Sequence, residues 1–155
     1  MRVRTIAGAA LAAALAVTLT ACGGGGGGGE GEGPQVKVQD NPEFPAGSTM
    51  AKLSEAGKVK VGIKYDQPLF GEKTLEGDFA GFDVEIAEAV AAEMGIKPED
   101  IDWVEAVSAN REPFIQQGKV DFVAATYTID EERDKVVDFA GPYYVAGQQI
   151  MVEKG

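Results

Sequence analysis

The chain has 155 residues, which is enough for one modest domain. It carries 14 basic and 25 acidic residues, and its formal net charge is -11. This acidity argues against nucleic acid or an anionic membrane surface as a partner, because both need a basic patch. There is one cysteine and no histidine. An internal disulfide, a Cys–His or Ser–His catalytic pair and a His-rich metal site are therefore excluded, and we expect no metal and no cofactor.

The first 22 residues are predicted to be an export signal. Arg2 and Arg4 form a short basic region, and residues 6–18 are apolar but too short for a comfortable membrane span. Residues 19–22, Leu-Thr-Ala-Cys, resemble the lipobox of bacterial lipoproteins. That resemblance implies that Cys22 is acylated, becomes the first mature residue and anchors the protein to a membrane. The alternative is an ordinary signal peptide that happens to contain a cysteine.

Residues 23–49 are predicted to be a flexible linker, rich in glycine, glutamate and proline. The unbroken glycine run at 23–29 has no side chains to bury and a high chain entropy, so it favours disorder. Pro34, Pro42 and Pro45 continue this composition. The globular part is therefore expected over residues 50–155.

Strand-like and helical patterns alternate in the globular part. β-Branched and apolar runs predict strands, and apolar residues at i, i+4, i+7 and i+8 predict helices. The expected strands cover residues 58–63, 101–104 and 120–125. The expected helices cover residues 82–94, then a short helix beginning near 108–110 and ending at 117, and a helix starting at 128–131. A hairpin or loop is expected at 74–82, and further extended segments at 139 and 149–152. This order predicts an α/β fold with a mostly parallel sheet flanked by helices.

Ligands of parallel sheets bind outside the carboxyl ends of the strands, which directs attention to three loops. These loops supply three cations, three hydroxyl groups and the start of a helix. On an otherwise acidic protein, such a cluster predicts an anion site, because arginine binds carboxylates in a bidentate manner and a helix start favours negative charge. The candidate binding residues are Lys64, Ser108, Arg111, Thr126, Thr128 and Arg133.

Each cation also has an ordinary interpretation when it is taken alone. Lys64 lies near Asp66 and could be a solvated lysine, and Arg111 could pair with a carboxylate on the surface. Arg133 lies among acidic residues and could be a solvated helix charge. The prediction of an anion site depends on the three loops coming together.

Four segments resemble the first lobe of the family 3 periplasmic solute-binding proteins, which are the polar amino acid receptors of ABC transporters. They are VGIKYDQP at 61–68, GFDVEIA at 81–87, GKVDFVAATYTI at 118–129 and VDFAGPYY at 137–144. The sequence Ser-Ala-Asn-Arg at 108–111 resembles the side-chain carboxylate loop of the glutamate and aspartate binders. The resemblance implies a periplasmic-binding-protein type II lobe.

The resemblance also implies a role for each candidate residue. Arg133 and Thr128 would hold the α-carboxylate of the ligand, and the Thr126 region would accept from its α-ammonium group. Asp83 usually supports the fold in this family and is not taken as a ligand. The side-chain carboxylate would be held by Lys64, Ser108 and Arg111.

A family member closes two lobes on its ligand like a hinged trap. We expect residues 50–155 to be a partial first lobe, with the second lobe absent from this chain. The implied function is an exported receptor, lipid-anchored to the outer face of the cytoplasmic membrane, that delivers glutamate or aspartate to the permease subunits of an ABC importer. Two alternatives share the fold. An exported dehydratase would need a general acid in the loops, and a sensor module would need a transmembrane helix and an output domain.

Overall fold

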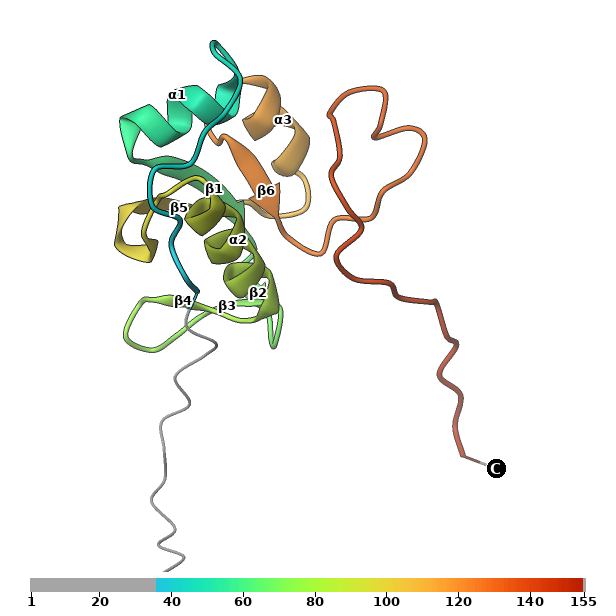
Figure 1. The fold of residues 1–155 in the computed structure, drawn as a ribbon. Coiled ribbons are helices and arrows are strands. Elements are labelled where there is room, and N and C mark those ends of the chain that lie inside the picture. The colour runs from blue at the N-terminus through green and yellow to red at the C-terminus, as the bar shows by residue number, and fades with distance from the viewer. Residues whose placement is uncertain (1–35, 155) are drawn as a thin grey trace, which may run out of the picture. The chain divides into compact units, whose positions relative to one another are not determined.

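The computed structural model describes residues 36–154 (Figure 1). The expected signal peptide, the lipobox with Cys22 and the glycine run lie outside the described residues. Within the described part, no helix has both the length and the apolar character that crossing a membrane would need.

A three-stranded parallel sheet forms the centre of the domain. Strand β1 (Val59–Ile63) lies between β5 (Ile101–Glu105) and β6 (Phe122–Ala124), and all three strands run in the same direction. Four of the five residues of β1 are buried, as expected for a central strand that is covered on both faces. The three strands predicted from the sequence are confirmed, with shifts of one or two residues at their ends.

Helix α2 (Phe82–Glu93) packs against this sheet and supplies much of the core. Its buried side chains include Val84, Ala87 and Ala91, which belong to one hydrophobic cluster with Ile63. The small alanine side chains allow the helix to approach the sheet closely, and acidic residues in its first turn suit the helix dipole. The helix expected over residues 82–94 is confirmed, and the chain turns away at Gly95 with a φ of 75°.

A small antiparallel sheet lies in the connection between β1 and α2. It contains β2 (Asp66–Gln67), β3 (Gly71–Lys73) and β4 (Phe79–Ala80), so the hairpin expected near 74–82 is present as the β3–β4 pair. A Cβ atom at Gly71 would lie 2.5 Å from the carbonyl oxygen of Lys64, so glycine lets β3 pass close to the end of β1.

Two short helices complete the connections between the strands of the main sheet. A 3₁₀ helix, η1 (Pro98–Asp100), leads into β5, and α3 (Arg111–Gln116) leads towards β6. The short helix expected to end at 117 is therefore present, and Gly118 follows it with a φ of 64°.

The end of the predicted linker belongs to the folded domain. The backbone N–H of Gln39 donates to the carbonyl of Ala92 at 2.9 Å, and Phe44 packs against the core. Helix α1 (Thr49–Ala56), which was not predicted, begins one residue before the expected domain start, with the Ser48 side chain accepting from the N–H of Ala51. The linker predicted over 23–49 is therefore wrong for residues 39–49. The packing of Phe44 and the helix cap at Ser48 hold this stretch on the domain in spite of its proline and glycine residues.

The segment after β6 also differs from its prediction. Residues 131–136 form turns instead of the regular helix expected from 128 onwards, and the Asp130 carboxylate accepts from the backbone N–H groups of Glu132 and Arg133 at 3.1 and 2.9 Å. This cap satisfies the first N–H groups, but only a few residues separate it from Gly141 and Pro142, which interrupt regular structure. The further extended segments expected at 139 and 149–152 belong to neither of the two sheets. No strand within residues 36–154 pairs with them, and a strand needs a partner.

Candidate functional site

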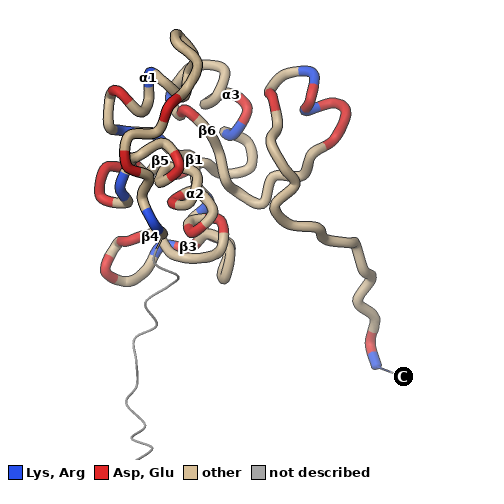
Figure 2. Tube along the Cα trace, viewed as in Figure 1, with Lys and Arg blue, Asp and Glu red and all other residues tan. Residues whose placement is uncertain are grey.

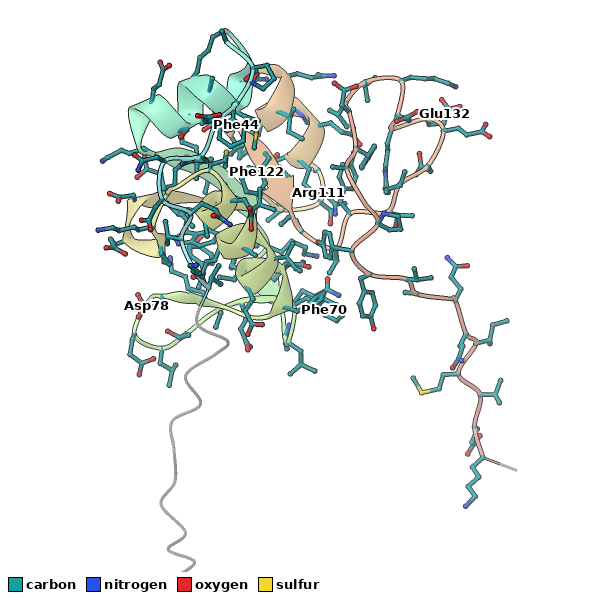
Figure 3. The ribbon with its side chains drawn as sticks, viewed as in Figure 1. Phe44, Phe70, Asp78, Arg111, Phe122 and Glu132 are labelled. Carbon is teal, nitrogen blue, oxygen red and sulfur yellow. The ribbon has the colours of Figure 1, made fainter. Side chains whose placement is uncertain are left out.

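The candidate site lies where the strands of the main sheet end. Lys64 follows β1, residues 108–111 lie beyond β5, and residues 125–128 follow β6. Figure 3 shows Arg111 at the start of α3, on the side that faces the segment after β6. Acidic residues occur on most elements of the described part (Figure 2), and at this edge Asp66, Glu112 and Asp130 lie close to the candidate cations.

Arg111 is the most buried of the candidate residues, with 6% of its surface exposed. Its Nη1 donates to the carbonyl of Ala125 at 2.9 Å, its Nε donates to the carbonyl of Ser108 at 3.4 Å, and its Cζ lies 4.3 Å from the centroid of the Tyr127 ring. No carboxylate within residues 36–154 forms an ion pair with Arg111, and its Nη2 has no hydrogen-bond partner among them. The guanidinium is thus hydrogen-bonded by neutral groups, while the charge of Glu112 nearby favours its charged form and partly offsets the lowering of its pKa by burial.

Arg133 lies against the same aromatic ring. Its Cζ is 4.7 Å from the Tyr127 centroid, and its Nη1 donates to the carbonyl of Thr128 at 2.8 Å. Its Nε is 3.3 Å from Oδ2 of Asp130 and 3.8 Å from Oε1 of Glu112. Burial lowers the pKa of Arg111, and the nearby charge of Arg133 lowers it further, although an arginine with this partial shift remains charged.

Tyr127 and Glu112 were not among the predicted site residues. The Tyr127 hydroxyl donates to Oε1 of Glu112, and its ring also packs against Phe139 at a centroid distance of 5.2 Å. Burial and the bond to Glu112 raise the pKa of Tyr127 to about 12, against the opposing charges of the two arginines. An aromatic residue between two threonines directly after a strand was the sequence signal that could have identified Tyr127.

Asp83 holds the backbone of another candidate residue. It is fully buried, and its Oδ2 accepts from the N–H of Thr126 at 2.8 Å while its Oδ1 accepts from the Tyr143 hydroxyl at 2.8 Å. Burial and this hydrogen bond raise the pKa of Tyr143. Thr126 has a φ of 46°, which is unfavourable for a β-branched residue, so the buried carboxylate stabilises a strained position at the end of β6.

The candidate residues fall into two groups. The first group surrounds Tyr127 and contains Arg111 and Arg133, with Ser108 and Thr128 contributing their carbonyl oxygens. The second group contains Lys64, which is 3.4 Å from Asp66, and Thr126, whose hydroxyl lies 2.8 Å from the carbonyl of Ala125 and 3.4 Å from Oε1 of Gln67. Within the described residues, no side-chain hydrogen bond or ion pair joins Lys64 to another candidate residue.

Comparison with known proteins agrees with this fold. The family described as "Bacterial extracellular solute-binding proteins, family 3" matches residues 59–155. A glutamine-binding protein of Geobacillus stearothermophilus is 41% identical over 114 residues, which are 72% of this chain and 44% of that protein. The glutamate-binding protein GluB of Corynebacterium glutamicum is 41% identical over 104 residues, which are 64% of this chain and 35% of that protein. This chain therefore spans less than half the length of these relatives.

A solved structure extends the similarity to three dimensions. The arginine-bound form of a mutant of domain 1 from TmArgBP superposes with a TM-score of 0.58 at 32% identity, and the match covers 63% of this chain and 74% of that one. The expected α/β fold of a type II periplasmic-binding-protein lobe is confirmed by this likeness and by the parallel sheet. The chain belongs to the bacterial extracellular solute-binding proteins, family 3.

Proposed function

We propose that this domain binds an amino acid with an acidic side chain, glutamate or aspartate, as the exported receptor of an ABC importer. The observation that carries the proposal is the environment of Arg111, a nearly buried cation without an ion pair in the described part of the chain. A buried charge is costly unless an opposite charge accompanies it. A ligand carboxylate at this edge of the sheet would supply that charge.

The presence of a second arginine favours a ligand with two carboxylates, such as an acidic amino acid, over a simple anion. Arg133 lies beside Arg111 but has a different surrounding, because it donates to the carbonyl of Thr128 and contacts Asp130 at the exposed rim. A ligand carboxylate can replace the half-exposed Asp130 as its partner at small cost, since exposed ion pairs contribute little to stability. We assign the α-carboxylate to Arg133 and Thr128. The side-chain carboxylate is assigned to Arg111, Lys64 and Ser108, and the α-ammonium to the Thr126 region.

The relatives narrow the ligand to an amino acid but do not choose between an acid and an amide. One is named as a glutamine-binding protein and another as a glutamate-binding protein. The charge of the site supports an acidic ligand, because a neutral amide would leave Arg111 without an anion. The relative that was solved as domain 1 in its arginine-bound form supports testing ligands on a chain of this extent.

Titration of the full chain with glutamate and with glutamine tests the proposal. Glutamate should bind at least about tenfold more tightly, because a hydrogen bond to a charged group contributes about 1.5–3 kcal/mol. Isothermal titration calorimetry at millimolar ligand gives both affinities, and a titration with glucose serves as the control for non-specific heat. Equal affinities for glutamate and glutamine would contradict the acidic ligand and indicate a receptor for polar amino acids in general.

We further propose that Cys22 carries a lipid that holds the receptor at the outer face of the cytoplasmic membrane. The residue lies outside the described part, and the support for this proposal is its place at the end of Leu-Thr-Ala-Cys, which follows the apolar stretch 6–18. Because Cys22 is the single cysteine of the chain, a label on it is unambiguous. Cells fed a labelled fatty acid should label the wild-type protein and not Cys22→Ser, which should leave the membrane fraction or stay unprocessed. A wild-type protein without label would refute the anchor.

A further inference from the structure

We propose that Tyr127 is a positioning residue that sets the spacing of Arg111 and Arg133 and thereby selects ligands with two carboxylates. This inference rests on the proposed function, because it assigns one carboxylate of the ligand to each arginine. It adds a residue that contacts neither carboxylate in that assignment. The carrying observation is that one aromatic ring lies against both guanidinium groups, with centroid distances of 4.3 and 4.7 Å.

Two like charges on neighbouring loops repel each other, and something must hold them together. The face of an aromatic ring attracts a cation, so a ring shared by two cations offsets part of their repulsion. The repulsion is present here, since the charge of Arg133 is one cause of the lowered pKa of Arg111. The ring of Tyr127 is therefore in the position that fixes the distance between the two charges.

The Tyr127 ring is itself held on two sides. Its hydroxyl donates to Glu112, a residue of the first turn of α3, and its ring packs on Phe139, which comes after the turns at 131–136. Arg111 and Glu112 are neighbours at the start of α3, while Arg133 lies in the later turns. Tyr127 thus connects two segments that are separate in the sequence, and each segment carries one of the arginines.

Spacing matters most for a ligand that uses both arginines. A ligand with two carboxylates needs the two guanidinium groups to be as far apart as its own carboxylates. Its affinity is therefore higher when this arrangement is already formed before binding. A ligand with one carboxylate uses Arg133 alone, and Arg133 keeps its bond to the Thr128 carbonyl without the ring. Loss of the ring should therefore lower the affinity for glutamate more than the affinity for glutamine.

The test compares Tyr127→Leu and Tyr127→Phe in the full chain, with Tyr144→Leu as the matched control. Tyr144 is a half-exposed tyrosine that packs on Phe70 and Phe82, away from the arginines. Calorimetry with glutamate and glutamine should give about a tenfold loss for glutamate and less than about a threefold loss for glutamine in Tyr127→Leu. Tyr127→Phe keeps the ring and should keep the ratio of the two affinities, as should Tyr144→Leu.

A second measurement needs no ligand and does not depend on how the leucine variant folds. In NMR spectra of the wild-type chain, ring currents should shift the Nε–Hε resonances of both Arg111 and Arg133. Absence of these shifts would overturn the proposal. Equal losses for both ligands, or no loss for either, in Tyr127→Leu would overturn this inference. The proposed function would stand in both cases as long as the wild-type chain binds glutamate more tightly than glutamine. A wild-type chain that bound neither amino acid would remove the proposed function and this inference together.

Discussion

Replacing Arg133 by alanine is expected to weaken the binding of every α-amino acid by roughly one to two decades in affinity. In the proposed assignment, Arg133 is the partner of the α-carboxylate, which all α-amino acids share. Its guanidinium is already oriented by the Thr128 carbonyl and the Tyr127 ring. Loss of a bidentate, charge-assisted contact of about 1.5–3 kcal/mol lowers affinity by roughly one to two decades for glutamate and glutamine alike. Calorimetry with glutamate and glutamine measures this loss.

A cation in the same segment provides the control for Arg133→Ala. Lys135 forms an exposed ion pair with Glu132 at 2.6 Å, and we expect Lys135→Ala to bind both ligands as the wild type does. Arg133→Lys should recover part of the affinity, because lysine restores the charge but not the planar fork. If Arg133→Ala and Lys135→Ala bind equally well, Arg133 is an ordinary surface charge paired with Asp130.

Replacing Arg111 by methionine is expected to weaken acidic ligands selectively. Methionine keeps an apolar side chain against the Tyr127 ring while removing the charge, so packing at this buried position is disturbed less than by alanine. The affinity for glutamate should fall by roughly one to two decades, and that for glutamine by less than about threefold. The carbonyl of Ala125 loses a donor, so thermal unfolding of the variant checks that the domain remains folded.

Lys119 is the matched control for Arg111→Met. Its Nζ lies 4.5 Å from the centroid of the Phe114 ring, so it is also a cation on an aromatic face, but it is exposed and lies after α3. We expect Lys119→Met to change neither affinity. Equal losses for glutamate and glutamine in Arg111→Met would show that the assignment of the two ligand ends is wrong.

The elements with a strong hydrophobic pattern were predictable, and those that depend on local capping were not. The apolar run of β1 and the helical spacing of apolar residues in α2 were sufficient to predict both elements, because each buries an apolar face. Helix α1 has no fully buried residue and follows a proline-rich stretch, so its pattern is weak. The segment after Thr128 has acidic residues that favour a helix start, but they produce one cap and a few turns.

For the site, the sequence predicted which edge of the sheet carries the cations, but it did not predict what holds each of them. Parallel topology places the loops after β1 and β6 at one edge, and that rule needs only the order of elements. The bond from Arg111 to the Ala125 carbonyl and the contact of Tyr127 with two arginines depend on packing between segments far apart in sequence. No local pattern encodes such contacts.

The order of the strands also affects how the chain folds during synthesis. Strand β1 is central in its sheet, yet both of its neighbours, β5 and β6, come later in the chain. A ribosome adds about 5–20 residues per second, so β1 waits several seconds for its last partner. Pairings between distant segments are slow to form, because a long loop must close first. The export signal predicted at residues 1–22 would have this delay in which to be recognised before the domain becomes compact.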